Sequence, residues 1–213
     1  MLVKVCGITD EQTALVAANA GADFIGFVFA TSSRQITTER AREIAGQLPS
    51  HIKTVGVFVN EDIEKVQEIA NLVGLDYIQL HGDETPAYCA AFSLPIIKAF
   101  SIKEQADIAR LKSYDCAYYL VDSPGVKYRG GSGVPFDWNL LNNQDIPREK
   151  LILAGGLHAD NIEDAIMKVQ PFAVDVSSGV ETEKRKDPKK IKQFLLKAKR
   201  TGENNRDSIH STK

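Results

Sequence analysis

The stretch Leu2-Val3-Lys4-Val5-Cys6-Gly7-Ile8-Thr9-Asp10 contains the structural unit from which the rest of the chain is built. A short apolar run is followed by a glycine-containing loop, and the loop ends at an aspartate of the kind that caps helices. The residues that follow, Asp10–Ala20, are helix-like in pattern. The sequence therefore opens with a strand, a loop and a helix, which together make one βα unit.

The same unit recurs to the end of the chain. The predicted strands are Leu2–Val5, Phe24–Val28, Thr54–Val59, Tyr77–Gln79, Ile96–Ala99, Tyr118–Val121, Leu151–Leu153 and Ala173–Val176. The predicted helices are Asp10–Ala20, Thr37–Gln47, Asp62–Val73, Thr85–Ala91, Lys103–Lys112, Asp137–Leu141, Asp160–Lys168 and Pro188–Lys199. The expected helix caps are Asp10, Thr37, Asp137 and Asp160, and Gly21 and Gly74 are expected to end helices in a left-handed conformation.

Eight βα units in about 200 residues predict an α/β protein, a single-domain (β/α)₈ TIM barrel over residues 1–200. The nearly continuous apolar strands are typical of a parallel sheet covered on both faces. A doubly wound open sheet is the alternative, but it usually has fewer strands and a glycine fingerprint that Cys6-Gly7-Ile8-Thr9 does not match. Residues 201–213 are polar without apolar periodicity, and we expect them to form a disordered tail.

The composition excludes several classes of function. The chain has 213 residues with a net charge of −2, so no basic field favours nucleic acid or an anionic membrane. No apolar run approaches the roughly 20 residues that span a bilayer, and we expect no secretion signal at the N-terminus. The three cysteines, an odd number without a CxxC pair, argue against disulfides and zinc and favour a cytoplasmic location. Both a monomer and a homodimer are compatible with the sequence.

Two chemically active residues end predicted strands. Cys6 follows the first apolar run and Asp122 follows the run Ala117-Tyr118-Tyr119-Leu120-Val121. In a parallel barrel all strand ends lie on one face, so this thiol and this carboxyl group are expected to flank one substrate. Such a pair can move two protons across a sugar, as an isomerase requires. The alternative for Cys6 alone is a small buried core residue, and for Asp122 a helix cap.

Two glycine-containing loops are candidates for binding a phosphate. Ala154-Gly155-Gly156-Leu157 follows the seventh predicted strand, and Ser177-Ser178-Gly179-Val180-Glu181 follows the eighth. Adjacent glycines let backbone N–H groups approach an anion. In (β/α)₈ enzymes these two loops frequently hold a phosphate group. One such loop would be weak evidence, because turns use glycine everywhere, but two at the expected places predict an anion site.

Arg34 and His81 follow the second and fourth predicted strands. An arginine in a loop is more often solvated, but if it points inward its planar fork suits a carboxylate. His81 is a candidate base, ligand contact or structural histidine, and a supporting role is favoured because no second ligand stands at metal-binding spacing. Cys89 and Cys116 are interpreted as packing residues. The glycine-rich segment 123–135 is the best candidate for a lid.

Taken together, these residues resemble the phosphoribosylanthranilate isomerase family of tryptophan biosynthesis. The resemblance covers nearly the whole chain. It is carried by KVCGIT at 4–9, GFVF with SSR at 26–34, QLHG at 79–82, GGSGVPFDW at 130–138, AGGL at 154–157 and DVSSGVE at 175–181. One departure is visible between Glu181 and Asp187, where the family often has a glycine and this chain has none.

The resemblance implies a (β/α)₈ barrel that performs an Amadori rearrangement of an aminoaldose phosphate without cofactor or metal. It implies that Asp122 is the general acid that opens the furanose and that Cys6 is the general base that removes the proton from C2. Arg34 would bind the anthranilate carboxylate. The full set of substrate-binding residues that it implies is Arg34, His81, Gly155, Gly156, Asp175, Ser177, Ser178 and Gly179.

Other functions on the same fold remain alternatives. A ribulose-phosphate epimerase would need paired aspartates and a metal, and indole-glycerol-phosphate synthase would need a Lys/Glu pair at the strand ends. A related histidine-pathway isomerase uses two aspartates, where this chain offers Cys6 and Asp122. A barrel that binds phosphometabolites without turnover is the alternative from another class, and it predicts that Cys6 is dispensable.

Overall fold

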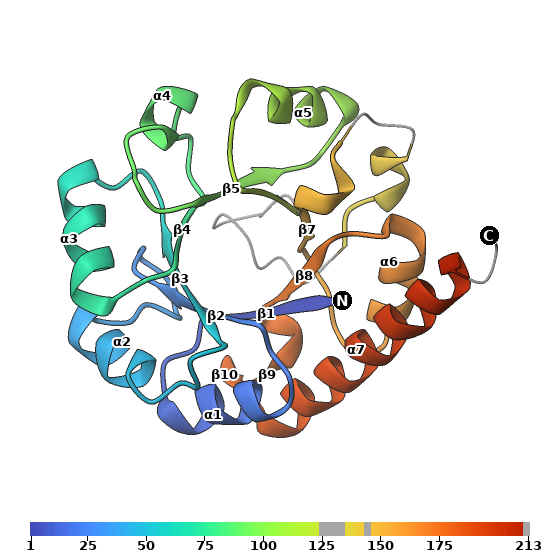
Figure 1. Ribbon diagram of the computed structural model, residues 1–213, viewed down its shortest axis with the longest axis horizontal. Helices are drawn as coiled ribbons and strands as arrows, with labels where there is room; N and C mark the ends of the chain where they lie inside the picture. Colours follow the sequence, from blue (N-terminus) through green and yellow to red (C-terminus); the bar gives the residue numbers. More distant parts are fainter. Residues whose placement is uncertain (124–134, 143–145, 211–213) are drawn as a thin grey trace.

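A computed structural model describes residues 1–123, 135–142 and 146–210. Within these residues, eight parallel strands close into a barrel in chain order (Figure 1). The strands are β1 (Leu2–Cys6), β2 (Phe24–Val28), β3 (Lys53–Phe58), β4 (Tyr77–Leu80), β5 (Ile96–Ser101), β6 (Tyr118–Asp122), β7 (Leu151–Leu153) and β8 (Ala173–Val176). All eight predicted strands and the predicted barrel are therefore confirmed. Three of the predicted ranges match the observed bounds without adjustment.

Helices surround the barrel on the outside (Figure 1). The α-helices are α1 (Glu11–Asn19), α2 (Thr38–Ala45), α3 (Ile63–Val73), α4 (Pro86–Cys89), α5 (Gln105–Ala109), α6 (Ile162–Val169) and α7 (Pro188–His210). Shorter 3₁₀ turns are η1 (Arg110–Ser113), η2 (Trp138–Leu141), η3 (Arg148–Lys150) and η4 (Ser178–Val180). The helix predicted at 137–141 is thus one 3₁₀ turn, which Asp137 caps by accepting a hydrogen bond from the Asn139 amide at 3.0 Å.

Most of the predicted helix ends are confirmed. Asp10 accepts a hydrogen bond from the Thr13 amide at 2.8 Å, and Thr37 caps α2 in the same way. Gly21 and Gly74 have φ angles of 97° and 74°, the left-handed conformation in which glycine carries no steric penalty. These positions fix where the chain leaves each helix for the next strand.

The cap predicted at Asp160 is wrong. Helix α6 begins at Ile162, Asn161 occupies the cap position, and the Asp160 side chain is 83% exposed. The Asn161 side chain accepts a hydrogen bond from the His158 amide and donates one to the Gly156 carbonyl oxygen, 2.9 Å each. A carboxylate cannot donate, so only the asparagine can tie the loop together in this way.

The disordered tail predicted at 201–213 is also corrected in part. Helix α7 continues through 201–210, and 211–213 lie outside the described residues. Gly202 is buried against Met1, so the helix gains a contact with the start of the chain that its polar composition did not indicate. Helix α7 packs between α6 and α1 and completes the outer ring (Figure 1). In the described part of the chain, no helix has the length and apolar character to cross a membrane.

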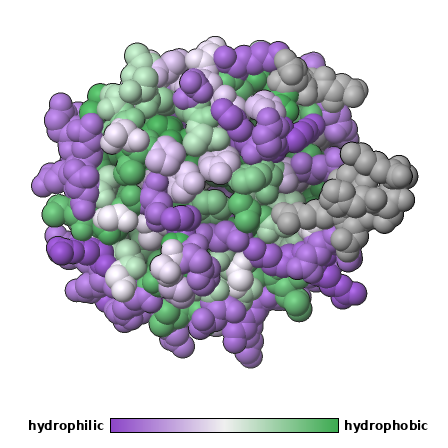
Figure 2. Space-filling view, viewed as in Figure 1, coloured by the Kyte–Doolittle hydropathy of each residue, from purple (hydrophilic) through white to green (hydrophobic). Residues whose placement is uncertain are grey.

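The barrel separates two apolar cores. Val3, Val5 and Val121 belong to the larger core between strands and helices, and Leu120 and Ala173 belong to the smaller core inside the barrel. Because side chains alternate along a strand, each residue next to an outward valine must point inward. The outer surface of the molecule is mainly hydrophilic around its periphery (Figure 2).

Four aromatic residues fill the end of the barrel where the strands begin. Phe24, Tyr77 and Tyr118 start the even strands β2, β4 and β6, and Phe172 precedes β8. Their rings contact one another in series, with centroids 5.7, 5.9 and 5.1 Å apart. A layer of four side chains from alternate strands is the usual filling of this fold. This end is packed with aromatic rings, which leaves the opposite end for chemistry.

Strands β9 (Glu181–Thr182) and β10 (Arg185–Lys186) form a small antiparallel hairpin after β8. Its two turn residues, Glu183 and Lys184, have φ angles of 50° and 63°. These are the conformations for which two-residue hairpins prefer glycine. The missing family glycine therefore leaves the hairpin fold in place, with some backbone strain at the turn.

Candidate functional site

Cys6 and Asp122 lie on the same rim of the barrel and point inward. Cys6 is the last residue of β1 and Asp122 the last of β6. Alternation with Val5 and Val121, which face the outer core, turns both side chains toward the interior. They are 7% and 5% exposed, so both reactive groups are largely withdrawn from water. The structure thus places on one rim the two residues that the sequence singled out.

Cys6 is surrounded by charge. The β1–β8 register places Lys4 beside Asp175, and their side chains form an ion pair at 3.1 Å. Burial raises the pKa of the Cys6 thiol above its ordinary value of 9.0, while the nearby ammonium groups of Lys4 and Lys186 act in the opposite direction. At neutral pH the resting residue is therefore a thiol with two cations within electrostatic reach.

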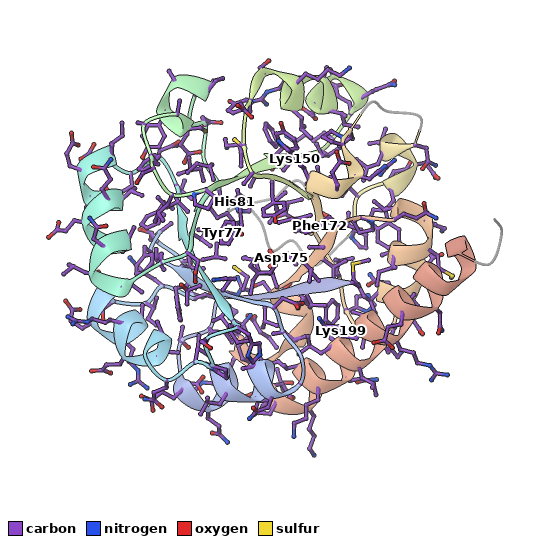
Figure 3. The ribbon with its side chains drawn as sticks, viewed as in Figure 1. Tyr77, His81, Lys150, Phe172, Asp175 and Lys199 are labelled. Atoms are coloured by element: carbon purple, nitrogen blue, oxygen red, sulfur yellow. The ribbon has the colours of Figure 1, made fainter. Side chains whose placement is uncertain are left out.

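The Asp122 carboxyl group is contacted by the residue that follows it and by the loop after β4. The Ser123 amide donates a hydrogen bond to Asp122 Oδ1 at 2.7 Å, and His81 Nε2 lies 3.4 Å from Asp122 Oδ2. His81 Nδ1 in turn lies 3.2 Å from Gln79 Nε2. His81 and Asp175 both lie within the ring of strands (Figure 3). The ring of His81 thus stands between the Gln79 side chain and the Asp122 carboxyl group.

The two glycine loops meet, as expected of the loops after neighbouring strands. Gly155 and Gly156 have φ angles of 85° and 64°. A side-chain carbon at Gly179 would collide with the Leu157 carbonyl oxygen, so the loop after β8 packs directly on the loop after β7. Gly156, Ser178 and Gly179 are thus close enough in the fold to contribute amides to one site. Ser177 instead donates its hydroxyl hydrogen to the Cys6 carbonyl oxygen at 3.1 Å.

Arg34 does point toward the site, but its fork is already engaged. Arg34 Nε and Nη2 donate to the two carboxylate oxygens of Glu181 at 2.6 and 2.9 Å. Lys186 donates to the same carboxylate at 2.7 Å and to the Ser177 carbonyl oxygen at 2.9 Å. Burial alone would raise the pKa of Glu181, but hydrogen bonds from Arg34 and Lys186 outweigh it and lower that pKa. A cavity of about 650 Å³ opens beside this cluster.

Sequence reasoning missed Glu181, Lys186 and Lys4 as parts of the site. Lys186 lies in the lysine-rich stretch 184–199, which is interpreted as the solvated face of a final helix, and Glu181 is considered only as the end of the glycine loop after the eighth strand. Only the hairpin brings Glu181 onto Arg34 and Lys186 onto Ser177. For Lys4 a signal was present. A lysine that alternates with valines on a buried strand must face the interior of a barrel, where a charge requires a partner.

Part of the predicted site lies outside the described residues. Of the lid candidate at 123–135, only Ser123 and Pro135 are described. Of the glycine-rich motif at 130–138, positions 130–134 lie outside the described residues. Among the described side chains, no group of three His, Cys, Asp or Glu residues converges in a way that could hold a metal ion.

Comparison with known proteins points to one family. The family model described as N-(5'-phosphoribosyl)anthranilate (PRA) isomerase matches residues 3–197. An N-(5'-phosphoribosyl)anthranilate isomerase from Bacillus mycoides is 54% identical over 200 residues, which cover 93% of this chain and 98% of the relative. The structure also resembles phosphoribosyl anthranilate isomerase from Thermotoga maritima, with a TM-score of 0.84, 40% identity, and coverage of 93% and 99% of the two chains.

A further similar structure contains a bound molecule. It is a phosphoribosyl anthranilate isomerase in complex with reduced 1-(o-carboxyphenylamino)-1-deoxyribulose 5-phosphate. Its TM-score is 0.81 at 39% identity, over 93% of this chain and 98% of the other. That compound combines a phosphate, a sugar-derived chain and an aromatic carboxylate.

The position of Gly155 yields a test of how tightly the acid is held. An alanine there would adopt an unfavourable φ and would also press on Ser123 and on Asp122 Oδ1. Gly74 is a matched control, because its φ is similarly positive but no atom lies within 4 Å of an added carbon. We expect Gly74→Ala to lower the free energy of unfolding by about 1 kcal/mol and Gly155→Ala by at least about 1 kcal/mol more. Urea denaturation measures both, and equal losses would contradict the tight packing around Asp122.

Proposed function

The chain belongs to the N-(5'-phosphoribosyl)anthranilate isomerase family and is an isomerase of tryptophan biosynthesis, and we propose that Asp122 and Cys6 perform its acid–base chemistry. The reaction converts an aminoaldose, N-(5-phosphoribosyl)anthranilate, into an aminoketose, 1-(2-carboxyphenylamino)-1-deoxyribulose 5-phosphate. It is an intramolecular redox change, in which C1 is reduced while C2 is oxidised. Two proton-transfer groups on one rim are sufficient for it.

Asp122 starts the reaction as general acid. It delivers a proton to the furanose ring oxygen, the C1–O bond breaks, and the nitrogen lone pair forms a cationic Schiff base. The Ser123 amide on Oδ1 and the His81 ring near Oδ2 orient the carboxyl group from two sides. The cationic imine withdraws electrons from C2 and thereby acidifies the proton on that carbon.

Cys6 completes the rearrangement as general base. Its thiolate removes the C2 proton, and the C2–H electrons form the C1–C2 double bond as the imine becomes an enolamine. Tautomerisation of the enolamine then places the carbonyl group at C2. The thiol resides in a largely dry site that raises its pKa, so the fraction present as thiolate limits this step at neutral pH.

The substrate carries two anionic ends, and the rim offers a place for each. Backbone amides around Gly156, Ser178 and Gly179 hold the phosphate, as loops after β7 and β8 often do in this fold. Arg34 binds the anthranilate carboxylate. Because Glu181 occupies Nε and Nη2, the edge of the guanidinium that contains Nη1 is the one turned to the ligand.

The observation that best supports this function is the placement of a thiol and a carboxyl group at the ends of β1 and β6, both turned into the barrel. It also favours this reaction over that of the two-aspartate isomerase of the same fold. The deciding experiment is an activity assay. Phosphoribosylanthranilate, formed in the cuvette from anthranilate and phosphoribosyl pyrophosphate, is fluorescent, and isomerisation removes the signal. A constant signal in the presence of folded protein would refute the assignment.

The roles of the two catalytic residues can be tested separately. We expect Asp122→Asn and Cys6→Ser each to lower kcat by at least about 10²-fold, because each removes one proton transfer from the transition state. KM should change little, since neither residue is assigned to either substrate anion. Steady-state fluorescence kinetics measures both constants. Turnover near the wild-type rate in either variant would exclude the role proposed for that residue.

The raised pKa of Cys6 predicts the pH dependence. The base acts as the thiolate, and burial shifts the thiol pKa above 9.0, so the active form becomes scarcer at each step down in pH. We expect kcat/KM of the residual activity of Asp122→Asn, in which the acid no longer titrates, to rise about tenfold per pH unit from neutral pH upward, with a midpoint above 9.0. A profile that is already level at neutral pH would contradict Cys6 as a base in this environment.

Glu181 provides a test of how Arg34 is positioned. Glu181→Gln retains the shape but loses the charge that fixes two of the guanidinium nitrogens, so Arg34 should present a less ordered edge to the carboxylate. We expect KM to rise about tenfold with a smaller change in kcat. Glu183→Gln is the control, because Glu183 is an exposed residue of the same hairpin and makes no ion pair with Arg34. An unchanged KM in Glu181→Gln would show that Arg34 needs no such support.

A further inference from the structure

Lys4 is a fully buried cation inside the barrel, with 0% of its surface exposed. It precedes Cys6 by two residues on β1, so both side chains point to the same side of the strand. Its ammonium group forms one ion pair, with Asp175 Oδ1 at 3.1 Å. A buried ammonium group costs several kcal/mol unless it is well compensated, which raises the question of what this lysine does there.

The ammonium of Lys4 and the thiol of Cys6 converge on one point. Gly26 on β2 pairs with Cys6, and its lack of a side chain leaves space between the strands. A carbon added to Gly26 would lie 3.0 Å from Lys4 Nζ and 2.9 Å from Cys6 Sγ. The two groups therefore share a single small space, in which the charge of each influences the ionisation of the other.

A second fully buried lysine among the described residues shows what a purely structural cation looks like. Lys98 lies 3.1 Å from the Glu84 carboxylate and donates to the carbonyl oxygens of Leu80, Gly82 and Ala99 at 2.9–3.2 Å. Four acceptors thus compensate the ammonium and fix the loop after β4. The ammonium group of Lys4, by contrast, donates to one carboxylate oxygen and lies in the same space as the thiol.

We propose that Lys4 is a positioning residue that sets the protonation state of Cys6, stabilising the thiolate by its charge and by a hydrogen bond from Nζ to Sγ. This inference rests on the proposed function of Cys6 as general base. It identifies the group whose charge favours the thiolate in a site from which water is largely excluded. A cation next to a cysteine favours its thiolate. When Cys6 takes the C2 proton, the thiol forms and Lys4 keeps Asp175 as its partner, so the charge on the ammonium is compensated before and after the transfer.

Other charges face Cys6 and are part of the balance. Asp175 on β8 disfavours the thiolate, and Lys186 on β10 favours it. Arg34, in the loop after β2, also interacts electrostatically with Cys6. Lys186 and Arg34 share the Glu181 carboxylate, which balances one of their two positive charges. Lys4 is the cation in the same interior space as the sulfur, so its removal should have the largest effect.

The test measures the Cys6 thiolate directly. Ultraviolet thiolate absorbance is titrated against pH for the wild type and for Lys4→Met, each minus the same protein carrying Cys6→Ser, which isolates the Cys6 signal. We expect Lys4→Met to lower the thiolate population at a given pH at least about tenfold. Lys98→Met, which removes a buried lysine away from Cys6, should leave the curve in place. An unshifted Cys6 curve in folded Lys4→Met would overturn the proposal.

A reciprocal measurement decides the matter if Lys4→Met fails to fold. Two groups that interact must shift each other's titration by the same amount. In protein with ¹³C-labelled lysine side chains, Cys6→Ser should therefore move the NMR titration of Lys4 to lower pH and leave that of Lys98 unchanged. A Lys4 titration that is the same in wild type and Cys6→Ser would refute the coupling.

These outcomes are separable from failure of the proposed function. Near-normal turnover of Cys6→Ser would exclude Cys6 as the general base, whether or not Lys4 shifts the titration of its thiol. If Cys6→Ser is inactive but Lys4→Met leaves the Cys6 titration curve unchanged, Cys6 remains the proposed base. Lys4 is then excluded as the residue that stabilises its thiolate.

Discussion

The pairing of β1 with β8 closes the barrel, and the geometry of the site depends on that closure. The two strands pair in parallel with Lys4 opposite Asp175, and the ion pair between these side chains lies on the seam. Once the ring is closed, every strand ends on the same rim and every second side chain points into a confined interior. Cys6 and Asp122, far apart in the chain, are thereby placed at one opening.

Closure also means that ionised side chains inside the barrel need partners that compensate their charge. A dry barrel penalises every ionised group, and the surroundings of Lys4 and Lys98, which are both buried, compensate this penalty in different ways. Lys98 has a carboxylate and three carbonyl oxygens and fixes a loop, whereas Lys4 shares its surroundings with a thiol. A fully compensated cation makes the fold more rigid. A cation with an ionisable neighbour can instead change how that neighbour titrates, which is of use to a catalyst.

The barrel could be predicted from the sequence because its determinants are local. Apolar runs such as Phe24–Val28 and caps such as Asp10 specify their own conformation, and eight repeats leave little choice of topology. One error occurred where a distant contact decides the outcome, because helix α7 continues past residue 200 with Gly202 buried against Met1. The other is local, because the Asn161 side chain accepts one hydrogen bond and donates another within its own loop, which a cap rule for aspartate does not anticipate.

The same distinction holds for the site. Cys6, Asp122 and the glycine loops could be found because strand ends are visible in the sequence and the fold places them together. The bidentate contact of Glu181 with Arg34 depends on a hairpin turn that places two non-glycine residues in the left-handed region, which no local pattern indicates. Charged residues that look solvated in a sequence can thus become part of a buried network.

A general base inside a barrel faces two opposing demands. Exclusion of water strengthens every electrostatic interaction with the substrate, yet the same exclusion disfavours the anion that the base must be. For Cys6, burial prevails in the resting protein and the nearby lysines oppose it. The adjacent cation eases this conflict, because its charge opposes the cost that burial places on the thiolate. On that basis the residue at the end of β1 and the lysine two positions before it form one functional unit.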